Sequence, residues 1–368
     1  MLKRIYVDNY KCLVNFELTF GSICLFLGPN GAGKSSVFEV LQNLRSFIGG
    51  EGRLEQIFKH TSLTRWQTLH IQTFELEVEG NKGIYKYLLK VDYDIEGHKA
   101  RVKSELLSYN KKPLLRFEQG EVHLYRDNHS VGPVYPFDWH LSAVSSIFAR
   151  PDNKLLTWFK EQVSQIIVVQ PNPALMTEIS ETEFDMPSYH LENFVSWYRH
   201  LSQDQGFAIE LNKTLREVLP GFDAFKFEKS GDQYRFKAHF RNENKNESVG
   251  YGFGDLSDGQ RMLIVLYALT LAVKMQHYTL CLDEPENFLA LPEIQPWIVQ
   301  LFELCEQDEA QALLISHHPE LIDYLLASPV GLWFERSGNL PTRVRPVVAP
   351  GESGVPVSEL IARGWLNE

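Results

Sequence analysis

Apolar and polar positions along the first 50 residues follow two different periods. Residues 2–27 alternate, which predicts strands, and the last of them, residues 23–27, is apolar throughout and predicts a buried strand. Residues 34–47 follow the helical period, and the helix is expected to end at Gly49-Gly50. The chain therefore opens with strands that lead into a strand–loop–helix unit.

The rest of the chain changes from strands to helices and back. Alternation from residue 70 to residue 126, interrupted by Gly80-Asn-Lys-Gly83, predicts an inserted antiparallel β subdomain with a hairpin. The later segments predict, in order, loop and helix (136–165), a short buried strand (166–169), helix (189–219), an alternating strand region (225–241), a polar loop (241–248), a buried helix (261–274) and two buried strands (278–284 and 312–315). This order predicts an α/β fold.

Charge narrows the choice of partners. The formal net charge is -11, which excludes coating of nucleic acid by bulk electrostatics and leaves room only for a local contact. Within residues 225–241, one strand face carries only basic side chains: Arg235, Lys237, His239 and Arg241. Two interpretations stay open here, a solvated strand face and a contact with nucleic acid or another partner.

The cysteines and the apolar runs add two expectations. The four cysteines are scattered without a CxxC spacing, so neither a zinc site nor a disulfide framework is indicated. The N-terminus lacks the apolar core of a signal peptide, and the longest apolar run, residues 263–273, is too short to span a bilayer. We therefore expect a soluble cytoplasmic protein.

The strongest chemical signal is Gly28-Pro-Asn-Gly-Ala-Gly-Lys-Ser35, between a buried strand and a helix. This is the phosphate-binding loop GxxxxGK[ST] in its required context. Its glycines let backbone N–H groups surround phosphates, and the helix N-terminus adds partial positive charge. Lys34 is expected to reach the β- and γ-phosphates, and the Ser35 hydroxyl to coordinate Mg²⁺. The sequence predicts binding of a nucleoside triphosphate.

Three further motifs follow in the second half of the chain. Leu256-Ser-Asp-Gly-Gln260 precedes the buried helix, where Ser257 or Asp258 serves either as an N-cap or as part of an anion site. The apolar strand 278–282 runs into Asp283 and Glu284, which fit a metal-binding carboxylate and a carboxylate that orients water. Strand 312–315 ends at Ser316-His317-His318, where a histidine can bond a γ-phosphate.

In this order the motifs resemble the ABC-type ATPases. The closest resemblance is to the structural-maintenance-of-chromosomes-like (SMC-like) branch, which includes RecF and the ATPase half of overcoming-lysogenization-defect (OLD) nucleases. The residues that carry it are Asp8-Asn-Tyr-Lys11, GPNGAGKS at 28–35, LSDGQ at 256–260, CLDEPEN at 281–287 and SHHPEL at 316–321. The resemblance covers residues 1–50 and 160–335 well. In the β insertion it extends only to the type of structure and not to matching residues.

The resemblance implies a role for each matching residue. The Walker A residues that bind ATP are Gly28, Asn30, Gly31, Ala32, Gly33, Lys34, Ser35 and Ser36, and the signature residues are Ser257, Asp258 and Gly259. Glu284 matches the catalytic glutamate and His317, rather than His318, the switch histidine. Ser35, Asp283 and the Q-loop glutamine would hold Mg²⁺, with Gln170 chosen and Gln72 as the competitor. Ala290 stands where many relatives have an aspartate, which puts signalling through that side chain in doubt.

The resemblance also implies a P-loop NTPase fold of ABC ATPase type with an inserted antiparallel β subdomain and a helical lobe. We expect an ATPase core of two lobes (1–50 and 160–345), a β-rich insertion with a helix (51–159) and a C-terminal tail or helix (346–368). Two ATP molecules would be held in a head-to-tail homodimer, because each signature peptide completes the site of the other copy.

Several functions were weighed against these motifs. The leading hypothesis is an ATP-gated dimeric switch that controls a separate effector, a nuclease or toxin, or a DNA or RNA contact in prokaryotic anti-phage defence. RecF-like DNA repair is the alternative. A transporter subunit lacks a coupling feature, a P-loop kinase does not explain LSDGQ or His317, and a nuclease would need acidic residues on strands that the segment after His317 does not show.

Overall fold

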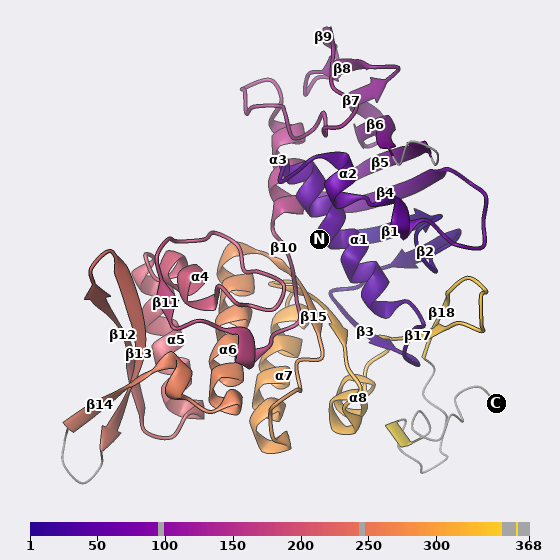
Figure 1. Cartoon of the computed structure of the whole chain (residues 1–368). Helices are drawn as coiled ribbons and strands as arrows, with labels where there is room; N and C mark the ends of the chain where they lie inside the picture. Colours follow the sequence, from indigo (N-terminus) through magenta and orange to yellow (C-terminus); the bar gives the residue numbers. More distant parts are fainter. Residues whose placement is uncertain (95–98, 243–246, 348–357, 360–368) are drawn as a thin grey trace. The chain divides into compact units, whose positions relative to one another are not determined.

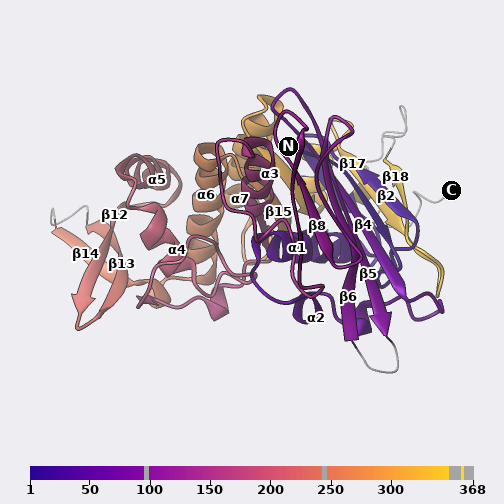
Figure 2. The ribbon, with the colours of Figure 1, turned by 90° about the horizontal axis from the view of Figure 1, so that it is seen from above.

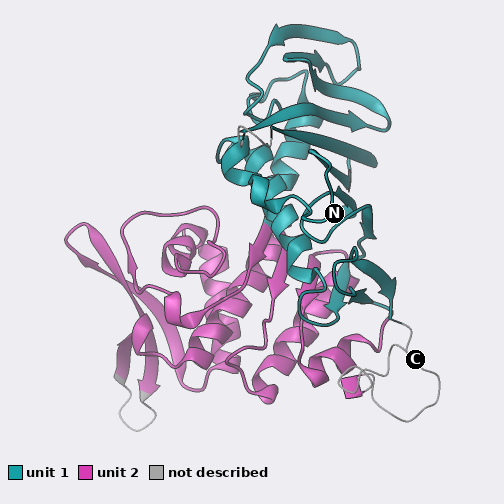
Figure 3. Cartoon of the chain, turned by 45° about the vertical axis from the view of Figure 1, so that its right-hand side comes forward, with its two compact units in different colours: residues 1–166, 329–348 teal, residues 167–328, 349–368 magenta. Residues whose placement is uncertain are grey.

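The computed structural model describes residues 1–94, 99–242, 247–347 and 358–359 (Figure 1). The chain forms two compact units, which Figure 3 shows in different colours. Unit 1 is Met1–Ile166 with Pro329–Val348, and unit 2 is Ile167–Ser328 with Ala349–Glu368.

Unit 1 contains an eight-stranded antiparallel sheet. Its order is β2 (Phe16–Thr19), β1 (Leu2–Asp8), β4 (Ile71–Gly80), β5 (Gly83–Asp94), β6 (Lys99–Tyr109), β7 (Lys112–Glu118), β8 (Glu121–Tyr125) and β9 (Val131–Pro136). Asn81 and Lys82 both have positive φ in the β4–β5 turn, as a two-residue hairpin requires, so the predicted hairpin is confirmed. Because β1 pairs with β4, the N-terminal strands and the inserted strands share one sheet.

Helices cover one face of this sheet. These are α1 (Lys34–Gly49), α2 (Leu54–Ile57) and α3 (Lys154–Ser164). The short turn η1 (His60–Ser62) follows α2. Figure 2 shows α1 and α3 on the same side of the sheet. Trp158 of α3 stacks on Tyr85 with ring centroids 4.8 Å apart, and Phe159 stacks on Tyr87 at 5.8 Å. A Cβ on Gly80 would lie 1.8 Å from the Trp158 ring, so this strand end needs a glycine.

Three further strands of unit 1 support the start of α1. The buried strand β3 (Ile23–Leu27) pairs in parallel with β17 (Gly331–Glu335), which pairs antiparallel with β18 (Arg343–Pro346). All five residues of β3 are buried, as its apolar run predicted. The chain leaves β3 directly into the glycine-rich loop and α1.

The core of unit 2 is built from parallel strands and long helices. The strands are β10 (Ile166–Val169), β15 (Thr279–Asp283) and β16 (Gln311–Ile315), and the helices are α6 (Asp258–Gln276), α7 (Leu291–Glu306) and α8 (Pro319–Leu325). The predicted buried helix is confirmed, because α6 buries residues on every side. Trp297 of α7 is fully buried, and its indole N–H donates to Thr270 Oγ1 of α6 at 2.8 Å.

The remainder of unit 2 is a four-stranded antiparallel sheet backed by two helices. The strands are β11 (Ile179–Ser180), β12 (Phe222–Ser230), β13 (Gln233–Asn242) and β14 (Glu247–Gly252), and the helices are α4 (Phe194–Leu201) and α5 (Gln205–Val218), with the short turns η2 (Pro173–Leu175) and η3 (Phe253–Asp255). In Figures 1 and 2, α4 and α5 lie between this sheet and α6. Tyr198 of α4 contacts Phe225, Phe227 and Phe236 of the sheet, with ring centroids 5.0 to 6.0 Å apart.

Two expectations need correction. The helical stretch 189–219 is two helices, because Asp204 caps a new helix by accepting a hydrogen bond from the Gly206 N–H. The polar stretch 241–248 is not simply a loop: its first two residues end β13 and its last two begin β14, while residues 243–246 lie outside the described residues.

The predicted C-terminal tail or helix, 346–368, falls largely outside the described residues. The predicted domain boundaries follow family lobes rather than compact units and stay a prediction. In the part of the chain that the structure describes, no helix is both long enough and apolar enough to cross a bilayer.

Candidate functional site

The glycine-rich loop of unit 1 is shaped by two glycines that face neighbouring backbone and side chains. Gly28 has φ +137°, and a Cβ there would lie 2.1 Å from the Phe334 carbonyl oxygen of β17. Gly33 has φ +102°, and a Cβ there would meet Thr342 Oγ1 at 2.7 Å. Thr342 also donates from Oγ1 to the Ala32 carbonyl at 2.8 Å. The base of the loop is therefore held between β17 and the segment before β18.

The tip of this loop and the start of α1 form a concentration of positive charge. The N-cap is Gly33, which has no side chain to satisfy the first helical N–H groups, and the first turn, Lys34-Ser-Ser-Val37, contains no acid. Lys34 is 6% exposed and donates from Nζ to the Gly28 carbonyl at 2.7 Å. Asn30, Gly31 and Ser35 are exposed. A helix N-terminus without a side-chain cap, beside a buried lysine, fits a phosphate group.

One residue at this loop was not anticipated from the sequence. Arg336, just after β17, donates from Nη1 to the Gly31 carbonyl at 3.5 Å and lies 5.1 Å over the ring of Trp66. No motif surrounds it, so only the fold reveals the contact. A second cation thus lies at the loop tip.

The carboxylates of unit 2 lie where β15 ends. Asp283 is 5% exposed and is paired in parallel register with Ile315 of β16. Glu284 has φ +52°, a strained conformation for a residue with a side chain, and its N–H donates to the Ile315 carbonyl at 2.9 Å. The Glu284 carboxylate accepts from Asn287 Nδ2 at 3.0 Å and from Gln170 Nε2 at 3.4 Å. The structure therefore brings Gln170 and Glu284 together.

The two candidate glutamines have different environments. Gln72 is fully buried in unit 1, where its Nε2 donates to the Asn9 carbonyl and its Oε1 accepts from the Tyr93 hydroxyl. All of its polar atoms are thus used within the fold. Gln170 follows β10, is half-buried and contacts Glu284. Of the two glutamines, only Gln170 contacts Glu284, and its assignment as the Q-loop residue stays a prediction.

The two adjacent histidines also differ. His317 is exposed, and its backbone N–H donates to Glu286 Oε1 at 2.9 Å. His318 is half-buried and is the N-cap residue of α8. Of the two, His317 is the more exposed residue beyond the end of β16, and its assignment as the switch histidine stays a prediction. Glu286 was not singled out from the sequence, because its partners lie about 30 positions further along the chain.

The signature residues form a capped helix start. Ser257 Oγ accepts from the Gln260 N–H at 3.2 Å, and Gln260 Oε1 accepts from the Ser257 N–H at 3.1 Å. Ser257 and Asp258 are exposed, and Asp258 pairs with Arg261. A Cβ on Gly259 would lie 3.1 Å from the Phe288 carbonyl. The N-cap interpretation is correct for this structure, and the hydroxyl stays accessible from outside.

The basic stripe of β13 is matched by acids. Arg235 pairs with Glu178 at 3.5 Å, Lys237 with Glu228 at 2.8 Å and Arg241 with Asp223 at 2.8 Å. His239 contacts Ser248 Oγ at 3.3 Å. These pairs favour the solvated strand face over a nucleic-acid contact.

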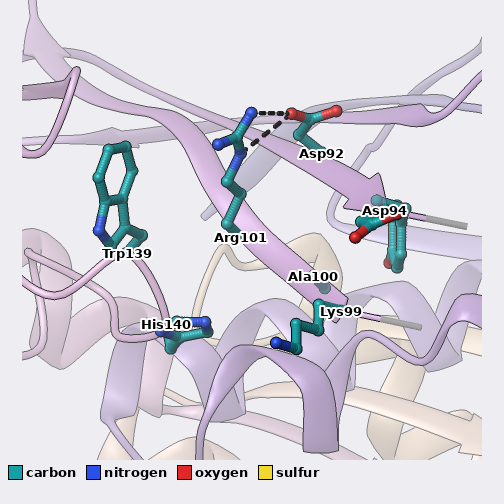
Figure 4. Close-up of a pocket in the computed structure, with 8 residues that line it drawn as sticks. Asp92, Asp94, Lys99, Ala100, Arg101, Trp139 and His140 are labelled. Atoms are coloured by element: carbon teal, nitrogen blue, oxygen red, sulfur yellow. Dashed lines mark hydrogen bonds and ion pairs between the residues drawn. The ribbon is translucent and has the colours of Figure 1, made fainter. Parts of the chain in front are cut away.

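Unit 1 contains a second basic surface, on the outer face of β5 and β6. Two neighbouring hollows of about 540 and 440 Å³ share Asp92, Arg101 and Trp139 (Figure 4). Arg101 pairs with Asp92 at 2.8 Å and lies 5.8 Å over the Trp139 ring. Three lysines that line the hollows, Lys90, Lys99 and Lys103, have no acidic partner among the described residues. Unlike Arg101, these three lysines are not neutralised by an ion pair within the described part of the chain.

Comparison with known proteins finds a matching family model and a curated relative. Residues 180–323 match the family described as "AAA domain, putative AbiEii toxin, Type IV TA system". An OLD nuclease of Thermus scotoductus is 37% identical over 73 residues, which are 18% of this chain and 13% of that protein. The chain thus spans only a small part of this relative.

Two solved structures cover nearly the whole chain. An SMC head bound to the C-terminal winged-helix domain of ScpA superimposes with a TM-score of 0.57 at 11% identity and covers 94% of this chain and 97% of that one. An SMC head with an extended coiled coil, bound to the C-terminal domain of ScpA derived from Pyrococcus furiosus, gives 0.52 at 9% identity and covers 100% and 98%. At these identities the two structures show a likeness of fold: the chain is similar to SMC heads in its α/β architecture. The predicted fold class, an α/β P-loop ATPase of ABC type, is confirmed.

Proposed function

We propose that this ABC-type ATPase binds and hydrolyses ATP. The observation that carries the proposal is the open N-terminus of α1 beside Lys34, in the loop motif that binds triphosphates. Asn30, Gly31, Ala32, Gly33 and Ser36 would contribute backbone or side-chain contacts to the phosphates. Ser35, Asp283 and Gln170 offer the oxygen ligands that Mg²⁺ prefers, and the bound ion would offset the charge of the phosphates.

Hydrolysis would depend on Glu284 and His317. The Glu284 carboxylate is held by the side-chain amides of Asn287 and Gln170, so it is oriented before a substrate arrives. We assign it to orient the attacking water and to accept its proton. The exposed His317 ring would donate a hydrogen bond to the γ-phosphate. Both residues follow buried parallel strands, which is where open α/β sheets bind ligands.

The unit of function would be a homodimer. Ser257 lies at the N-terminus of α6 with its hydroxyl accessible from outside, so it can meet the phosphate held by another copy. Two ATP molecules would then join two chains head to tail, and hydrolysis would remove the shared ligand and loosen the dimer. ATP would thereby control assembly.

We assign the dimer a role in prokaryotic anti-phage defence, in the cytoplasm, where it controls a separate nuclease or toxin. Two findings support this role: the family description names a toxin and a toxin–antitoxin system, and the similar Thermus protein is an OLD nuclease. Co-purification with the product of a neighbouring gene, with and without ATP, would test it.

The ATPase proposal is tested by Glu284→Gln. We expect this variant to bind ATP as the wild type does and to turn it over about 10²- to 10⁴-fold more slowly, because water positioning is lost. Glu303→Gln, an exposed glutamate on α7, is the matched control and should not change turnover. Unchanged turnover in Glu284→Gln would remove Glu284 from its role.

RecF-like contact with nucleic acid is the alternative function, and the hollows around Trp139 are the observation that favours it. Lysines without ion pairs beside an exposed indole suit a phosphate backbone and a stacked base. Lys99→Glu with Lys103→Glu should then weaken binding of a labelled single-stranded oligonucleotide at low salt, while Lys226→Glu on β12 should not. Equal binding by both variants would count against this surface.

A further inference from the structure

A carboxylate to which the matched motifs assign no role, that of Glu286, joins the two loops that carry Glu284 and His317. Glu286 Oε1 accepts two hydrogen bonds, from Ser316 Oγ at 2.8 Å and from the His317 N–H at 2.9 Å. Its other oxygen, Oε2, is buried and has no hydrogen-bond partner among the described residues. Both hydrogen bonds of the Glu286 side chain therefore go to the segment that follows β16.

These bonds fix the backbone where the histidine loop begins. Ser316 is fully buried, and its hydroxyl donates to Glu286 while accepting from the His318 N–H at 3.1 Å. Three consecutive residues are thus tied to one carboxylate, two directly and one through the serine. Bonds in such a chain strengthen one another in a buried setting.

The same turn also holds Glu284. The Glu284 N–H donates to the Ile315 carbonyl at 2.9 Å, and the Asn287 N–H donates to the Glu284 carbonyl at 3.2 Å. Glu284 and Glu286 thus lie in one short turn, residues 284–287, and Glu286 connects this turn to His317 through a hydrogen bond. One Glu286 oxygen, Oε1, is occupied by Ser316 and the His317 N–H, and the other, Oε2, is buried.

We propose that Glu286 is a positioning residue that couples the His317 loop to the Glu284 turn, so that both groups meet the γ-phosphate in register. This inference rests on the proposed ATPase function. It assigns Glu286 no contact with ATP: the carboxylate acts through the backbone of residues 316–318.

The hydrogen bonds of Glu286 predict different effects for its substitution by glutamine and by alanine. Glu286→Gln keeps one side-chain oxygen that can accept both hydrogen bonds. Its NH₂ group replaces Oε2, which accepts no hydrogen bond from the described residues, so the substitution breaks none. Glu286→Ala removes the acceptor and leaves the buried Ser316 hydroxyl and the His317 N–H without it. Gln should therefore rescue what Ala loses.

The test compares ATP turnover and ATP affinity in Glu286→Ala, Glu286→Gln and the control Glu303→Ala. We expect Glu286→Ala to lower kcat about 10- to 100-fold, since small misplacements of catalytic groups cost that much, and to leave KM for ATP within about threefold. Glu286→Gln and Glu303→Ala should stay within about threefold of wild type. Wild-type kcat in Glu286→Ala would overturn the proposal, whereas a wild-type chain without turnover would refute the ATPase function instead.

A second measurement needs no activity and guards against simple unfolding. Amide hydrogen exchange of residues 316–318 should speed up in Glu286→Ala and return to the wild-type rate in Glu286→Gln, with the exchange of α6 unchanged. In turnover, Ser316→Ala combined with Glu286→Ala should be no worse than Glu286→Ala by itself. Unchanged exchange in Glu286→Ala, additive losses, or equal acceleration throughout unit 2 would contradict the coupling.

Discussion

The helices α1 and α6 both begin at motifs for which we propose phosphate binding, yet their N-termini are built differently. The N-cap of α1 is Gly33, so no N-cap side chain covers the first amides, and Lys34 lies buried beside them. The N-cap of α6 is Ser257, which forms a reciprocal capping box with Gln260, and Asp258 adds a negative charge in the first turn. One helix start is open to an anion, and the other is satisfied within its own chain.

This difference indicates an order of events. ATP can bind at α1 without displacing any capping side chain, whereas a phosphate at α6 must share or replace the bond between Ser257 and Gln260 and must approach Asp258. Contact at α6 is therefore the weaker and more conditional of the two. A site of that kind suits a switch, because small changes in its partner decide whether it engages.

The largest expected effect lies at α1. Lys34→Ala should weaken ATP binding about 10- to 150-fold, because a charge-assisted hydrogen bond to phosphate contributes roughly 1.5 to 3 kcal/mol. Titration with a fluorescent ATP analogue measures this, with Lys112→Ala on β7 as a surface control. Retained affinity in Lys34→Ala would show that the open helix start is sufficient without the lysine.

An added negative charge at the start of α6 should weaken dimerisation without affecting ATP binding. Ser257→Asp keeps a good N-cap but adds a second carboxylate next to Asp258, so we expect normal folding and ATP binding with dimerisation weakened by about tenfold or more. Sedimentation with ATP measures the dimer, and thermal unfolding checks the cap. If the variant dimerised as well as wild type, Ser257 would not face a phosphate.

The loop geometry predicts unequal costs for two glycines. Gly33→Ala places a Cβ against Thr342 at positive φ and should destabilise unit 1 by roughly 2 kcal/mol or more. Gly31→Ala also has positive φ but meets nothing within 4 Å, so about 1 kcal/mol is expected. Urea unfolding of both variants gives the comparison, and equal losses would argue against contact between the loop and Thr342.

The smallest effect concerns the cap itself. Ser257→Ala should lower stability by about 1 kcal/mol through the loss of the capping bond, while Lys34→Ala affects binding more than stability. The free energy of unfolding of unit 2, followed by the buried Trp297, provides the readout. No change in this variant would mean that the capping box does not hold α6 in solution.

Local patterns explain what could be predicted from the sequence. The glycine-rich loop at 28–35, the helix predicted over 34–47 and the buried helix predicted over 261–274 depend on neighbours in the chain, and α1 and α6 confirm the two helices. The strand β14 was missed because it is short and contains Gly250 and Gly252, and glycine is depleted in strands. The break between α4 and α5 was missed because it depends on a single capping aspartate, Asp204.

Contacts between distant residues account for the rest. Gln170 and Gln72 could not be separated by sequence, because one meets Glu284 and the other Tyr93 only after folding. The acids that pair with the basic stripe of β13 come from β12 and from the segment before β11. In the sequence Glu286 is only one of several acids in a turn, because its hydrogen-bond partners, Ser316 and His317, meet it only in the folded chain.

The most direct test of the account is sedimentation of the Glu284→Gln chain with and without Mg²⁺ and ATP. We predict a monomer without nucleotide and a dimer with it, because ATP held at α1 of one copy is completed by α6 of the other and is not hydrolysed. The dimer should disappear when Ser257→Asp is added. A chain that binds ATP and stays monomeric, or a dimer indifferent to Ser257→Asp, would contradict the shared site.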